Sequence, residues 1–130
     1  MIVFTLGTIN FPFHRSVNWL NSLLETKLIN EPVVFQHGTT PVNNLNHPLV
    51  TLHKSLTRYE MQDYIQKSSL VISHAGQGST RNLAELRASF ILLPRLKRYG
   101  EHIDDHQLIF ARQVEQFGIH YCKEYHQLVR

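Results

Sequence analysis

Hydrophobic residues occur along the chain in two patterns, as short unbroken runs and as spaced positions. The unbroken runs are rich in β-branched and aromatic residues, and most end at a glycine, a proline or a polar turn. Runs of this kind predict strands, and a lack of polar residues within them is typical of strands covered on both faces. The predicted strands cover 2–6, 33–36, 49–52, 70–73, 90–93 and 119–122.

The spaced hydrophobic positions lie between these runs and follow a helical period. In the segment 13–28 the apolar residues from Val17 to Leu28 fall on one helical face, and Thr57 with Glu60 has the spacing of a capping box. Strands that alternate with helices predict βαβ units. We therefore expect an α/β fold, a doubly wound, largely parallel, Rossmann-like sheet in one domain, 1–130. The other predicted helices cover 57–67, the segment from a glycine-rich turn to about residue 88, 102–117 and the final residues.

Composition places the chain among globular proteins. Of its 130 residues, 42% are hydrophobic and 18% are charged, and the net charge is only +3. The longest cluster of basic residues is the short segment 95–98. This balance does not favour nucleic-acid binding. The single cysteine, Cys122, excludes an internal disulfide and favours a cytosolic location. The apolar start lacks a basic leader and is broken by Gly7, so we expect a strand there rather than a signal peptide.

The stretch 73–80, Ser-His-Ala-Gly-Gln-Gly-Ser-Thr, joins a predicted strand to a predicted helix. We expect Gly76 and Gly78 to let the backbone turn sharply and approach a ligand, and Ser79 or Thr80 to cap the helix. The free N–H groups of the first helical turn, with the helix dipole, would then face an anion. The stretch predicts a phosphate or diphosphate site, with a plain connecting turn as the alternative.

Two familiar phosphate-binding motifs do not fit this stretch. The dinucleotide fingerprint requires a third glycine where Arg81 stands, and the nucleoside triphosphatase loop requires a lysine where Gly78 stands. A nicotinamide-dependent oxidoreductase of Rossmann type is therefore disfavoured.

Ligands of parallel α/β sheets bind at the carboxyl ends of the strands. That edge would bring together Gly7 with Thr8, the loop 36–38, the turn 74–79 and the segment 94–106, which suggests a pocket for a nucleotide-like anion. The basic residues of the last segment, Arg95, Lys97 and Arg98, are interpreted as a solvated loop, with a role near donor phosphates as the alternative.

Several histidines near this edge admit more than one interpretation. His74 ends a buried strand, and a structural hydrogen bond to backbone and a ligand contact are both open. His102 and His106 have helical i,i+4 spacing beside acidic residues, but Ile103 stands where the zinc-protease motif requires glutamate. We expect no metal and no cofactor.

Three segments resemble one known family. The turn from His74 to Ser79, the run 94–102 and the tetrapeptide 104–107 are similar to the C-terminal, donor-binding domain of family 28 glycosyltransferases. Within this family the chain most resembles the small subunits of two-component bacterial polysaccharide galactosyltransferases, and the start with Gly7, Thr8 and 12–15 fits that group. The resemblance covers essentially the whole chain.

The resemblance implies roles for individual residues. Gly76, Gly78 and Ser79 would face the diphosphate of a UDP-sugar, and His74 and Gln77 would also belong to the donor-binding site. His106 and Gln107 would lie near the sugar hydroxyls, and Gly7 and Thr8 would line the opposite side of the nucleotide.

One position departs from the family pattern. Six residues after Gly76 the family has a glutamate that contacts the ribose, and this chain has Asn82. Either Asn82 or Glu85, on a neighbouring helix face, would take that role.

The function implied by the resemblance is that of a donor-binding subunit. The chain would be half of an inverting GT-B enzyme, a UDP-sugar-dependent hexosyltransferase that extends a lipid-linked saccharide acceptor in exopolysaccharide or capsule synthesis. Galactose is the expected sugar, with glucose and N-acetylglucosamine as the alternatives. It would be active only with a membrane-attached acceptor-binding subunit, which supplies the general base and holds the chain at the inner face of the plasma membrane. The alternative is a non-catalytic subunit that stabilises or localises a partner glycosyltransferase.

Overall fold

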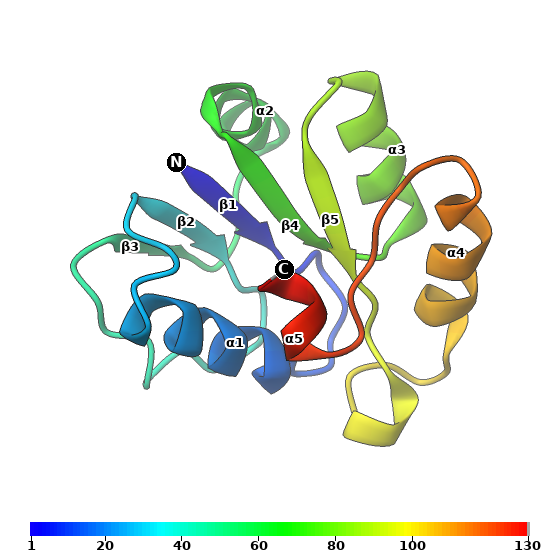
Figure 1. Ribbon diagram of the computed structural model, residues 1–130, viewed down its shortest axis with the longest axis horizontal. Helices are drawn as coiled ribbons and strands as arrows, with labels where there is room; N and C mark the ends of the chain where they lie inside the picture. Colours follow the sequence, from blue (N-terminus) through cyan, green and yellow to red (C-terminus); the bar gives the residue numbers. More distant parts are fainter. Residues whose placement is uncertain (130) are drawn as a thin grey trace.

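The computed structural model describes residues 1–129 and contains a five-stranded sheet in which every neighbouring pair of strands is parallel, in the order β3-β2-β1-β4-β5 (Figure 1). This order confirms the doubly wound α/β sheet predicted from the sequence. The strands are β1 Ile2–Thr5, β2 Val33–Gln36, β3 Val50–His53, β4 Leu70–His74 and β5 Phe90–Leu93.

Helices cover both faces of the sheet. Helices α1 and α5 pack on one face, where their apolar side chains join those of Ile2 and Phe4, and helices α2 and α3 pack on the other, around Val3 and Val71 (Figure 1). Helix α4 packs beside β5 through Ala111. The helices are α1 His14–Glu25, α2 Arg58–Lys67, α3 Gln77–Glu85, α4 His106–Glu115, α5 Tyr125–Leu128 and a 3₁₀ turn, η1 Lys97–Tyr99.

The burial of β1 explains why its sequence is apolar except for Thr5 at its end. Side chains alternate across a strand, so Phe4 faces α1 while Val3 faces α2 and α3. Both side chains are fully buried, and the Phe4 ring stacks on Phe35 of β2 with 5.2 Å between ring centroids. A strand covered on both faces has no position for an exposed polar residue.

The structure corrects several predicted boundaries. Helix α4 begins at His106 rather than at His102, because the residues from Glu101 to Asp105 form bends. Helix α1 ends at Glu25, which leaves Leu28 exposed. Helix α3 ends at Glu85, three residues before the predicted end. The predicted strand 119–122 is a single bridge between Leu92 and Tyr121.

The strand order defines where a ligand can enter. The chain leaves β1 toward β2 on one side of the sheet and leaves β4 toward β5 on the other. The loops that follow β1 and β4 therefore diverge, and a crevice forms between them at the carboxyl edge. Within residues 1–129, no helix combines the length and apolar character needed to cross a membrane.

Candidate functional site

Helix α3 begins at this crevice and its first turn is not capped by a side chain. Gly76 is the N-cap residue, and no side-chain hydrogen bond caps the helix. The first N–H groups of a helix have no carbonyl partner within it, so those of Gln77, Gly78 and Ser79 remain available to a ligand. Helix α2 differs, because the predicted capping box of Thr57 with Glu60 is confirmed there.

The prediction that Ser79 or Thr80 caps α3 is wrong, since both lie inside the helix. The Thr80 hydroxyl donates back to the carbonyl of Gly76 at 2.7 Å.

Neither of the two motif glycines is required by a sharp turn. Gly76 has φ −73° and ψ 137°, a conformation open to any residue, and Gly78 is helical. A Cβ on Gly76 would come within 2.5 Å of the His74 ring, whereas a Cβ on Gly78 would meet nothing within 4 Å. Gly76 is therefore a packing glycine, and Gly78 leaves open space at the helix start.

His74 is the centre of the packing at this edge. Its ring also fills the space beside Gly7, where a Cβ would overlap it, and Gly7 has φ +70° in addition. The ring is held at both nitrogens, by Gln107 Nε2 at 3.1 Å from Nδ1 and by Ser79 Oγ at 3.2 Å from Nε2. These partners are side chains, so the backbone hydrogen bond considered for His74 is not the one that forms.

Burial sets the charge of His74. The side chain is only 5% exposed, and this burial, with the nearby cation of Arg95, lowers its pKa to about 3. His74 is therefore a neutral imidazole at physiological pH. It lines none of the clefts described below, so the structure places it beneath the site rather than within it.

An open cleft of about 400 Å³ lies between α3 and α4 and is named here the α4 cleft. The backbone of Gly76 and Gln77 forms one wall, and His106 and Gln107 from the start of α4 form the other. The remaining lining residues are Ile9, Ala75, His102 and Phe110.

A second cleft, of about 230 Å³, lies on the other side of the α3 start, between the β1 loop and α2, and is named the α2 cleft. Ser79 and Asn82 line it from α3, opposite Gly7 and Thr8. The other residues that line it are Thr5, Gln36, Ser55, Leu56, Arg58 and Met61.

A third, shallower depression of about 470 Å³ runs along the outer side of α3 and is named the outer groove. It shares Arg58, Ser79 and Asn82 with the α2 cleft, and it also carries Gly78, Arg81 and Glu85. The uncapped start of α3 thus has a hollow on each side.

Arg95 does not belong to a solvated loop, contrary to the interpretation from sequence. It is only 1% exposed, and its guanidinium donates to the carbonyls of Leu6, Phe11 and Glu101 at 2.7, 2.7 and 3.1 Å. Burial lowers its pKa to about 10, while the Glu101 carboxylate opposes that shift. Arg95 is therefore a cation that fastens the loop after β1 to the loop after β5.

Comparison with known proteins identifies the family. The model of the glycosyltransferase family 28 C-terminal domain matches residues 1–130. The chain belongs to this family. None of the curated proteins matches it at a significant level.

A solved structure entitled "Crystal Structure Analysis of the Glycotransferase of kitacinnamycin" has the same fold as this family 28 domain, with a TM-score of 0.62 at 15% identity. The match covers 92% of this chain and 30% of that chain.

The structure brings most of the predicted site residues of this family 28 domain to the hollows around α3. The α4 cleft holds one group and the α2 cleft with the outer groove holds the other, and the two groups meet at the start of α3. The ten predicted site residues that line these hollows are Gly7, Thr8, Gly76, Gln77, Gly78, Ser79, Asn82, Glu85, His106 and Gln107.

Asn82 and Glu85 are placed differently. Asn82 lines both the α2 cleft and the outer groove, while Glu85 lines only the outer groove. Of the two, Asn82 is the one beside Gly7 and Thr8.

Sequence reasoning missed Arg58. It is the first residue of α2 and lines both the α2 cleft and the outer groove. The sequence contains a pattern that could have identified Arg58. The capping box at Thr57 fixes the start of the helix and therefore places Arg58 in the first helical turn, at the carboxyl edge of the sheet.

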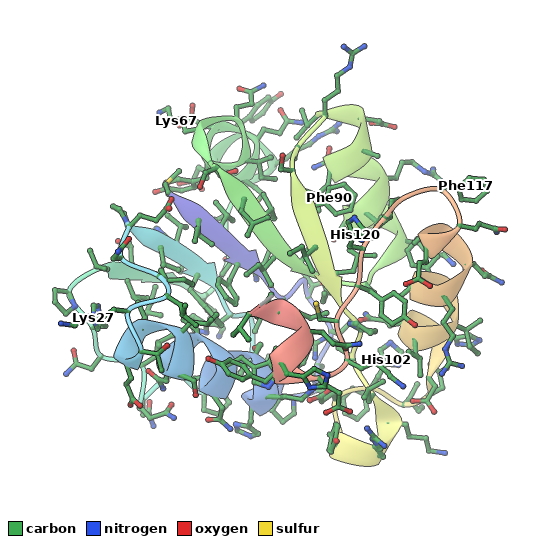
Figure 2. All side chains as sticks on the ribbon, in the orientation of Figure 1. Lys27, Lys67, Phe90, His102, Phe117 and His120 are labelled. Atoms are coloured by element: carbon green, nitrogen blue, oxygen red, sulfur yellow. The ribbon has the colours of Figure 1, made fainter. Side chains whose placement is uncertain are left out.

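Residues near His102 form a polar cluster around the Asp104 carboxylate. His102 precedes α4, as Figure 2 shows, so it does not share a helical face with His106. The Asp104 carboxylate lies 3.1 Å from His102 Nδ1 and 2.6 Å from His106 Nδ1, and its pKa is lowered first by the backbone N–H of His106. Among residues 1–129, no group of three potential ligands could hold a metal ion.

Proposed function

We propose that the chain binds a UDP-sugar with its diphosphate at the start of α3. The observation that carries this proposal is the uncapped first turn of α3, which offers N–H donors at the junction of the α2 and α4 clefts. A helix start with free donors and a positive dipole end favours a doubly charged group. The family supports a nucleotide-sugar as the ligand that carries it.

The two clefts suggest how the donor lies. The nucleoside occupies the α2 cleft, with Asn82 contacting the ribose diol and Arg58 beside the phosphates. The sugar occupies the α4 cleft, where His106 lies on the wall opposite Gln77. This orientation agrees with the roles implied by the resemblance, in which Gly7 and Thr8 line the nucleotide side.

The transfer requires the departing UDP to be stabilised as negative charge develops on it. The N–H groups of the α3 start, the Ser79 hydroxyl and the Arg58 guanidinium are the groups available for this. The acceptor hydroxyl must also lose a proton to a general base, and we assign that base to the acceptor-binding half of the enzyme. Attack from the face opposite UDP inverts the anomeric configuration.

The finer assignments rest on the resemblance of the motifs. The donor sugar is galactose, and the acceptor is a lipid-linked saccharide of exopolysaccharide or capsule synthesis. The acceptor-binding half is a membrane-attached subunit that brings this chain to the cytoplasmic face of the plasma membrane.

Calorimetric titration tests the proposal. UDP, UDP-galactose, UDP-N-acetylglucosamine and ADP are titrated into the folded chain and into an Asn82→Ala variant. We expect the uridine ligands to bind more tightly than ADP, UDP-galactose to bind more tightly than UDP-N-acetylglucosamine, and Asn82→Ala to weaken binding about three- to tenfold, the effect of one lost hydrogen bond. Equal binding of UDP and ADP would contradict the assignment of the nucleoside.

The alternative, a non-catalytic subunit that supports a partner transferase, predicts a different result. In the assembled complex, transfer would then be unchanged by Asn82→Ala. We expect transfer to fall in parallel with UDP-sugar affinity.

A further inference from the structure

We infer that Gln107 is a positioning residue that acts through His74 to make the Ser79 hydroxyl a hydrogen-bond donor toward the ligand diphosphate. The inference rests on the proposed function for the identity of the ligand, while the order of the hydrogen bonds follows from the structure alone. It gives Gln107 a role other than the sugar contact implied by the resemblance.

The first step is the orientation of the Gln107 amide. One of its two terminal atoms lies 3.1 Å from the backbone N of Ala75 and 3.0 Å from the backbone N of Arg95. Backbone N–H groups only donate, so this atom is the oxygen Oε1. The other terminal atom is therefore the NH₂ group, which only donates.

The second step is the tautomer of His74. Gln107 Nε2 lies 3.1 Å from His74 Nδ1 and must donate to it, so Nδ1 carries no proton. A neutral ring then carries its proton on Nε2. A ring turned over by 180° would place carbon atoms where Nδ1 now faces Gln107 and Nε2 now faces Ser79, so both hydrogen bonds would be lost.

The third step is the direction of the Ser79 hydroxyl. His74 Nε2 lies 3.2 Å from Ser79 Oγ and, because it carries the proton, it donates to that oxygen. The hydroxyl proton of Ser79 is then free to point away from His74. Since Ser79 lines both the α2 cleft and the outer groove, this proton is offered at the start of α3, beside the free N–H groups.

Burial keeps the directions of these hydrogen bonds unchanged across the physiological pH range. Gln107 and His74 are each 5% exposed, and the pKa of His74, lowered to about 3 chiefly by burial, keeps the ring neutral. With Ser79 oriented as a donor, its hydroxyl offers a proton to the anion as the free N–H groups of the α3 start do. The reversed tautomer would make Ser79 donate to His74 and turn its lone pairs toward the phosphates.

The direct test is ¹⁵N NMR of the His74 ring in the purified chain. We expect a protonated Nε2 and an unprotonated Nδ1 at pH 7, unchanged down to about pH 5. A proton on Nδ1, or a charged ring at pH 6, would overturn the inference.

Variants then test whether the direction of the hydrogen bonds from Gln107 through His74 to Ser79 matters for UDP binding. Ser79→Ala should weaken UDP about tenfold and leave uridine unchanged, because a hydrogen bond to a charged group is lost, and Ser79→Thr should retain most of the UDP affinity. Gln107→Glu keeps an acceptor for Ala75 and Arg95 but cannot donate to His74. We therefore expect a proton to appear on Nδ1 in the NMR spectrum of this variant.

A double-variant comparison separates positioning from general structural damage. If Gln107 acts through Ser79, the loss of UDP affinity in Gln107→Glu should be smaller in the Ser79→Ala background. Equal losses in both backgrounds, or full UDP affinity in Ser79→Ala, would overturn the inference. If neither UDP nor uridine binds while the Nε2 tautomer is observed, the proposed function and the role of Ser79 toward UDP both fail, and only the hydrogen-bond order stands.

Discussion

Gly76 and His74 are in contact, because a side chain on Gly76 would place its Cβ 2.5 Å from the Cε1 atom of the imidazole ring. The backbone of Gly76 is in an ordinary extended conformation, with φ −73°. The requirement for glycine at this position thus comes from the histidine two residues before it. The pair links the packing of β4 to the start of α3.

Gly76→Ala is expected to lower the free energy of unfolding by about 1–3 kcal/mol, the usual cost of overpacking a buried site. Urea denaturation measures the change. In a His74→Ala background the clash is absent, so the same substitution should cost much less there. An equal cost in both backgrounds would mean that the ring is not what excludes the side chain.

Gly78→Ala should have the opposite effect on stability. The residue is helical and an added Cβ meets nothing within 4 Å, so the free energy of unfolding should rise, by up to about 1 kcal/mol. UDP affinity should nevertheless fall, because the methyl group narrows the approach to the free N–H groups of α3. A variant that is more stable and binds UDP unchanged would show that the phosphates lie elsewhere.

The stability of the fold should depend on pH through His74. Its pKa is about 3 in the fold against an ordinary value of 6.5, so between these values the unfolded chain binds a proton that the folded chain does not. The free energy of unfolding should therefore fall as pH decreases from about 6.5, by up to about 1.4 kcal/mol per pH unit from this residue.

Urea denaturation between about pH 6 and 4.5 isolates this effect, because Glu31, whose pKa is lowered chiefly by the N-terminal ammonium group, loses its contribution only below its ordinary pKa of 4.5. His74→Gln should remove most of the slope. The same slope in this variant would show that His74 is not the responsible group.

Arg58→Ala should weaken UDP more than uridine, since the guanidinium lies beside the proposed phosphate position and not only beside the nucleoside. We expect a loss of about five- to tenfold for UDP in titration calorimetry. Arg112→Ala is the matched control, because Arg112 lines a separate cavity beyond α4. A loss of the same size in the control would indicate a general effect of charge.

Much of the fold could be predicted from local sequence. Strands covered on both faces leave unbroken apolar runs, as from Val33 to Phe35, and the capping box at Thr57 marks the start of α2 within one residue. The start of α3 could not be located in the same way, because its N-cap is a glycine without a side-chain hydrogen bond. A helix start left open for a ligand lacks the signal that sequence reasoning uses.

The candidate site was predicted as a set of residues but not as an arrangement. Arg95 was interpreted as solvated, because the three carbonyls that bind it come from distant segments and from bends that no local pattern reveals. Gln107 was expected near the sugar, and its hydrogen bonds with two backbone N–H groups and with His74 were not foreseen. Partners far apart in sequence decide both roles.

The central claim is that a diphosphate binds at the start of α3. Amide ¹H–¹⁵N spectra recorded during a UDP titration test it most directly, with uridine as the comparison. We predict that the backbone N–H signals of Gln77, Gly78 and Ser79 shift with UDP and much less with uridine, while those of α5 stay unchanged. Binding of UDP without shifts at these three amides, or equal shifts with uridine, would contradict the claim.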